Sequence, residues 1–124
     1  MYYNIWAARI TGVDTSAPIN IVGTTDNIDN STTLDIPGIT TTVNNTLLLA
    51  VATHKGSDGN TMSIESGWTA EQTIDAPNTS QSYGIAGIIG SKEFESAGAT
   101  GTVTVTSVAG DDTFGVMFAI APES

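Results

Sequence analysis

The chain has 124 residues, of which 13 are acidic, 3 are basic and none is cysteine, so its formal net charge is -10. This length can bury the core of one domain without a metal or disulfide staple, and the lack of cysteine excludes a disulfide framework or a thiolate metal site. Nucleic acids and anionic membranes attract clustered basic residues, whereas Arg9, Lys55 and Lys92 are scattered, so we expect neither as a partner.

Apolar residues recur at every second position along most of the chain, which predicts β-strands. The first extended segments are separated by turn-forming residues. They are expected at Tyr2–Ile10, Ile19–Gly23, Ser31–Ile36 and, as a short piece, Ile39–Val43, with a turn over Thr24–Asn30. Thr46–Thr53 is the most continuously apolar run, which predicts a central strand that is buried on both sides or nearly so.

A loop from His54 to Asn60 is expected to end this central strand. The strands expected beyond it are Met62–Ile64, Thr69–Ile74 and Tyr83–Ile89, and only Ser91–Ala97 could form a helical turn. Near the C-terminus, Thr102–Thr106 and Phe114–Ile120 flank a Gly-Asp-Asp turn and predict a β-hairpin. We therefore predict one all-β domain over residues 1–124: a single β-sandwich, jelly-roll-like or immunoglobulin-like, with about eight antiparallel strands.

Short motifs along nearly the whole chain resemble the β-sandwich domains of tailed-phage and prophage structural proteins. They are Ile5–Gly12, the Pro-Gly turn of Pro37–Thr41, the leucine-rich Asn45–Val51, the Gly-Trp-Thr step of Ser66–Thr69 and Gly101–Val105. The resemblance implies a non-enzymatic virion structural protein, most simply a capsid decoration protein or another surface component. Its expected partners are a major capsid or tail protein and further copies in a homo-oligomer or symmetric lattice, and its expected location is the virion.

The aromatic start of the chain is the segment expected to contact such a partner. Tyr2, Tyr3 and Trp6 would form a contact arm or an edge strand, or else an ordinary first core strand. An alternative function is a carbohydrate-binding or adhesive module of a tail or fibre. In that case Trp68 would stack on a sugar, with Asp58 and Asn60 as hydrogen-bonding partners, although Trp68 could equally fill one end of the core.

His54 is the only histidine, so a histidine-dependent catalytic triad would have to be built around it. Neighbours on one loop do not supply a supported base and an oxyanion hole, so we expect a solvated loop histidine and no enzyme. No spacing in the sequence brings two carboxylates together at the separation that a glycosidase needs. The acidic residues considered were Asp14, Glu65, Glu71, Asp75, Glu93 and Glu95.

Clusters of acidic and amide side chains could supply oxygen ligands to Ca²⁺. These clusters are Asp26 with Asp29, Asp58 with Asn60, and Asp111 with Asp112. None has the regular spacing of a calcium-binding loop, and Asp, Asn and Gly are common turn formers. We therefore expect no cofactor, with calcium as a minor alternative.

Overall fold

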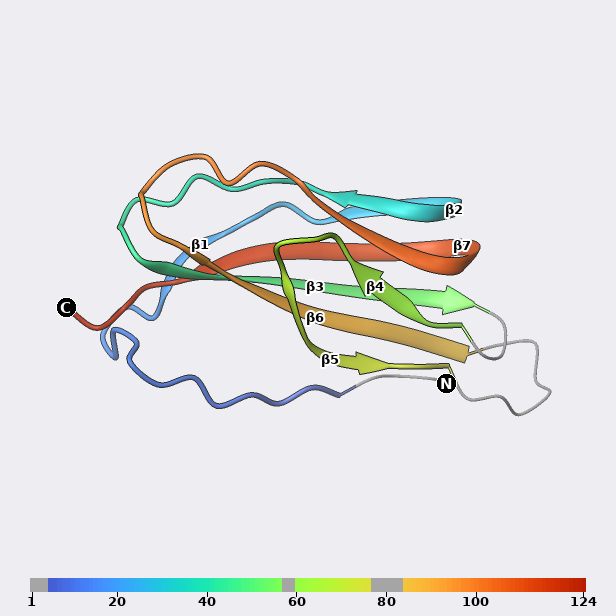
Figure 1. Ribbon diagram of the computed structural model, residues 1–124, viewed down its shortest axis with the longest axis horizontal. Coiled ribbons are helices and arrows are strands. Elements are labelled where there is room, and N and C mark those ends of the chain that lie inside the picture. The colour runs from blue at the N-terminus through green and yellow to red at the C-terminus, as the bar shows by residue number, and fades with distance from the viewer. Residues whose placement is uncertain (1–4, 57–59, 77–83) are drawn as a thin grey trace.

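The computed structural model describes residues 5–56, 60–76 and 84–124 (Figure 1). Within them the chain forms seven strands, all paired antiparallel: β1 (Ile19–Val22), β2 (Asp26–Ile36), β3 (Thr46–Gly56), β4 (Met62–Ile64), β5 (Thr69–Ile74), β6 (Gly84–Phe94) and β7 (Val103–Ile120). They belong to one sheet of order β1-β7-β3-β6-β5, with β2 and β4 also paired to β7. The predicted all-β class is confirmed.

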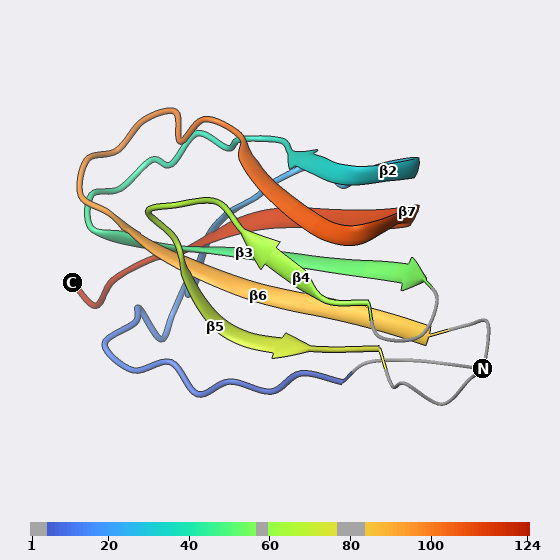
Figure 2. The same cartoon turned by 45° about the vertical axis from the view of Figure 1, so that its right-hand side comes forward.

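Strands β2 and β7 pair along most of their lengths and bend together, which folds the sheet over itself into two layers (Figures 1 and 2). The pairing register shifts on both sides of Ser31, and Asn30 has a positive φ of 55°. Such irregularities increase the local bending of a paired ribbon. Layer one holds β1, β3, β5, β6, the start of β2 and the end of β7, whereas layer two holds β4, the end of β2 and the start of β7.

The hydrophobic core lies between these two layers. A Cβ added to Gly115 in layer one would lie 2.7 Å from Ile36 Cγ1 and 3.0 Å from Leu34 Cδ2, both in layer two. A glycine at this position therefore permits the close approach of the layers. The largest fully buried apolar side chains are Leu34, Ile36, Leu48, Ile88, Met117, Val103 and Val105.

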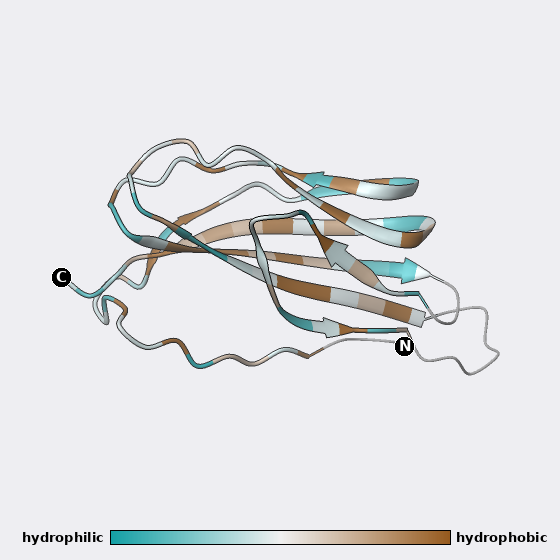
Figure 3. Cartoon of the chain, viewed as in Figure 1, coloured by the Kyte–Doolittle hydropathy of each residue, from teal (hydrophilic) through white to brown (hydrophobic). Residues whose placement is uncertain are grey.

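Strand β3 is central, as predicted, because it lies between β6 and β7. Alternate residues on β3, such as Leu48 and Ala50, are buried between the layers. The residues between them, including Leu47 and Leu49, are only half-buried, so one side of the strand is less covered than the sequence suggested. Figure 3 shows that hydrophobic residues also run along β6 and β7 on either side of β3.

Within the described residues, two predicted strands are not present as expected, and the segment considered for a helical turn is not helical. Residues 5–11 are not part of a strand, and the segment Ile39–Val43 contributes only an isolated bridge between Thr40 and Ala99. Strand β6 continues to Phe94, where a helical turn was considered, because its residues pair with β3 as far as Thr46.

The C-terminal hairpin prediction is also wrong in its pairing. The chain does reverse direction between the layers, but Gly110-Asp111-Asp112 lies inside the bent strand β7 (Figure 1). The two halves of β7 do not pair with each other. The first half pairs with β2 and β4, and the second pairs with β1, β2 and β3. The turn expected over Thr24–Asn30 is replaced from Asp26 onward by β2, because β2 shares the bend of β7.

Candidate functional site

Layer one has a second apolar face, which points away from layer two and which we call the outer face. Directly opposed residues of antiparallel strands project to the same side of a sheet. The pairing register therefore aligns Val22, Phe118 and Leu49 in one row and Val116, Val51 and Ile89 in the next. The outer face consists of Val22, Leu47, Leu49, Val51, Ile89, Phe114, Val116 and Phe118, all of them half-buried or exposed.

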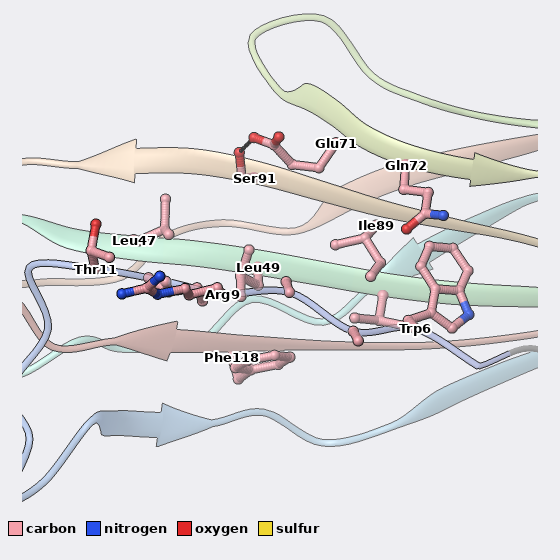
Figure 4. A pocket seen from close by; sticks show the side chains of 14 residues that line it. Trp6, Arg9, Thr11, Leu47, Leu49, Glu71, Gln72, Ile89, Ser91 and Phe118 are labelled. Atoms are coloured by element: carbon pink, nitrogen blue, oxygen red, sulfur yellow. Dashed lines mark hydrogen bonds between the residues drawn. The ribbon is translucent and has the colours of Figure 1, made fainter.

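The N-terminal segment 5–11, which we call the arm, crosses part of this face (Figure 4). A groove of about 660 Å³ lies between the arm and the sheet. In the close-up, the ring of Trp6 lies beside Ile89 and Gln72, and the Arg9 side chain lies between Leu49 and Thr11. The sheet residues that line the groove are Leu47, Leu49, Val51, Glu71, Gln72, Ile89, Ser91 and Phe118.

The arm is held by few contacts. Within the described part of the chain, no hydrogen bond joins residues 5–11 to the strands below. Trp6 and Ile10 are half-buried, whereas Ala8 between them is exposed and Ile5 is 75% exposed. Side-chain packing, without strand pairing, therefore keeps the arm on the outer face.

The chain is anchored immediately after the arm. The backbone N–H of Asp14 donates to the Ala121 carbonyl at 3.1 Å, and that of Glu123 donates to the Gly12 carbonyl at 2.9 Å. Gly12 has a φ of 73°, a conformation that glycine adopts without strain, and a Cβ built on it would have open space around it. Gly12 therefore marks the boundary between the arm and the anchored fold.

Polar groups line the groove on the side of β5. The buried Ser91 hydroxyl on β6 donates a hydrogen bond to the Glu71 carboxylate on β5 (Figure 4). Gln72, the next residue on β5, lies beside Trp6. The groove thus combines an apolar floor with one acidic margin.

Of the predicted partner contacts, Trp6 lies in the groove, and its position on an apolar sheet face is consistent with a contact arm. Tyr2 and Tyr3 lie outside the described residues. Contact with a partner stays a prediction for all three residues.

Neither Trp68 nor Asn60, the two described residues considered for a sugar site, lies on an exposed platform. Trp68 is half-buried and packs against the core. The Asn60 side chain is 1% exposed and accepts a hydrogen bond from the Val108 backbone N–H at 3.2 Å. A glycan does not reach this Asn60 side chain in the present conformation, and Asp58 lies outside the described residues.

His54 is not a solvated loop residue, which corrects the sequence prediction. Strand β3 extends to Gly56, and the alternation of the strand points His54 between the layers, where it is fully buried. Its Nδ1 lies 2.7 Å from the Thr113 hydroxyl, whereas Nε2 has no hydrogen-bond partner. A Cβ on Gly56 would lie 2.7 Å from that Nε2, so glycine leaves the space that the imidazole needs.

Burial lowers the pKa of His54 from its ordinary value of 6.5, although Asp111 and Asp112 oppose this shift. Below about pH 6.5 the unfolded chain binds a proton that the folded chain resists, so stability is lost as the pH falls. We expect the free energy of unfolding to decrease between about pH 7.5 and about pH 5.5. Urea unfolding over this range should show a flatter profile for His54→Asn. An equally steep profile in the variant would assign the pH dependence to other groups.

The acidic residues that the structure describes do not assemble a metal centre. The described residues hold no group of three or more His, Asp or Glu side chains placed to bind a metal ion. Asp26 and Asp111 each accept a hydrogen bond from the backbone N–H of the following residue, at 2.9 and 2.8 Å. These local bonds are typical of Asp in bends, and calcium binding stays an untested alternative.

Sequence reasoning did not identify the outer face. Its signal was present in the leucine-rich strand, where Leu47, Leu49 and Val51 alternate with the buried Leu48 and Ala50. A strand with one solvated face would carry polar residues at the alternate positions. The apolar residues on both sides were interpreted as burial, whereas one side forms a face that, among the described residues, the arm covers in part.

Comparisons with protein-family models, curated proteins and solved structures found no match to this chain. Among the described residues there is no helix of the length and apolar character needed to cross a membrane.

Proposed function

We propose that this chain is a non-enzymatic structural protein that acts through protein–protein contacts made by the outer face. One observation carries this proposal: the outer face is apolar across neighbouring strands and is incompletely covered. Val22, a member of the first apolar row, is 61% exposed, and Phe114, on the same strand as Val116, is 45% exposed. Contiguous exposed apolar surface is typical of interaction sites, since leaving it in water is unfavourable.

We further propose that these contacts are made on a phage particle, by a capsid decoration protein or another surface component. The support for this setting is the resemblance of the sequence motifs to phage β-sandwich domains. The partner would be the major capsid or tail protein, or further copies of the chain in a symmetric lattice. A carbohydrate-binding role is less well supported, because Trp68 packs against the core and Asn60 is buried.

The experiment that tests this setting is quantitative mass spectrometry of purified particles from the source. We expect the chain to be present in a fixed ratio to the major shell protein. Its absence from the particles would contradict the virion role and leave only the contact function of the outer face.

A further inference from the structure

We propose that the arm of one copy occupies the groove of a second copy, so that two copies of this chain are joined by exchange of residues 5–11. This inference rests on the proposed function and names the partner of the outer face. The arm already shows which chemistry fits the groove: a segment outside any strand whose half-buried Trp6 and Ile10 line it, with the ring of Trp6 beside Ile89 (Figure 4).

The construction of the arm permits this exchange. The hydrogen bonds of Gly12 and Asp14 hold the chain after the arm, whereas within the described residues none holds the arm itself. Gly12, with a φ of 73°, has no Cβ and can adopt backbone conformations that other residues rarely adopt, so the chain can change direction at this point. The seven residues of the extended arm span at most about 25 Å, enough to reach a closely apposed copy. Exchange then replaces each contact by an identical one.

The charge distribution suits an arm supplied by a second copy as well as it suits the chain's own arm. Arg9 is the only charged side chain before Asp14, so the start of the chain is basic. Residues 14–124 hold all 13 acidic residues against Lys55 and Lys92, a net charge of -11. Two acidic bodies repel each other, and an inserted basic segment reduces that repulsion at the point of contact. The carboxylate of Glu71 at the margin of the groove has the sign that suits Arg9.

The uncovered part of the outer face is a reason to favour a second copy. Val22 and Phe114 do not line the groove, and they stay exposed while the arm is in place. When the arm of one copy binds in the groove of another, the sheet of the first copy lies close to Val22 and Phe114 of the second. A reciprocal exchange about a two-fold axis would cover the same surface on both copies.

Thiol cross-linking tests this proposal on the full chain, which contains no cysteine of its own. One protein carries Ala8→Cys on the arm, and a second carries Gln72→Cys on β5; both positions are exposed and line the groove. The two proteins are co-expressed, purified and treated with a short bis-maleimide. The control pairs Ala8→Cys with Thr106→Cys, which is exposed on the outer side of layer two. A third sample carries Ala8→Cys and Gln72→Cys in the same chain.

We expect a covalent dimer of the two different variants from the Ala8→Cys and Gln72→Cys mixture, and none from the Thr106→Cys control. Cross-linking that occurs only within the chain of the double variant would overturn the exchange. A lack of cross-linking in all samples would also overturn it, because the arm would then not occupy the groove. Particle counting remains a separate test, so a chain found on particles without exchanged arms would contradict only this inference.

Discussion

Leu48→Ala is expected to lower the free energy of unfolding by about 2–5 kcal/mol. Leu48 is 1% exposed and lies on the inner side of β3, between the two layers. Removing its isobutyl group loses apolar burial and leaves a cavity that the surrounding strands fill only in part. Urea or thermal unfolding monitored by tryptophan fluorescence measures this loss directly.

Leu47→Ala is the matched control, because the same change is made one residue earlier and on the opposite side of the same strand. Leu47 is half-buried in the outer face, so we expect it to cost about 1 kcal/mol or less. Equal losses for the two variants would contradict the assignment of Leu48 to the core and Leu47 to the outer face.

Gly115→Ala is expected to destabilise the protein by about 1–3 kcal/mol through overpacking. The new Cβ would lie 2.7 Å from Ile36 Cγ1 and 2.8 Å from Ile36 Cδ1, closer than such atoms pack. Ile36 is fully buried, so its side chain has no solvent-filled space into which it can move. Because Gly115 and Ile36 lie in different layers, this variant measures how closely the bent β2–β7 ribbon brings the layers together.

The double variant Gly115→Ala with Ile36→Val tests the same contact by compensation. Ile36→Val removes Cδ1, one of the two Ile36 atoms that the new methyl group would crowd, and so relieves part of the overlap. We expect the double variant to lose less stability than the sum of the single variants, as coupled neighbours do. Strict additivity in equilibrium unfolding would show that the two residues do not share this contact.

The sequence predicted the fold class because a two-residue period dictates strands regardless of their partners. It placed β3 at the centre for a different reason, because the run Thr46–Thr53 is the most continuously apolar in the chain. It could not predict the bend of β2 and β7, because the Gly-Asp-Asp sequence suits both a tight hairpin turn and an irregular bent strand. Only the pairing of β7 with strands on both layers distinguishes these two outcomes.

The candidate site was predicted only in part. The aromatic start predicted a contact segment; Trp6 lies on the outer face, and its contact with a partner stays a prediction. His54 was misplaced because Lys55, Gly56 and the polar residues beyond resemble a loop, whereas pairing with β6 continues the strand to Gly56. Pairing with a distant strand overrides the local preference of these residues for a loop, and the local sequence does not predict it.

The central claim is that the outer face makes the assembly contact, and the most direct test is the number of copies bound per particle for two charge variants. Val22→Asp places a carboxylate on the outer face, at a residue that is 61% exposed. The control Val108→Asp makes the same change on the β2–β7 bend, at a residue that is 68% exposed. Both variants should fold with unchanged unfolding midpoints. We predict that Val22→Asp is lost from particles while Val108→Asp is retained at the native ratio. Retention of Val22→Asp at that ratio would contradict the account.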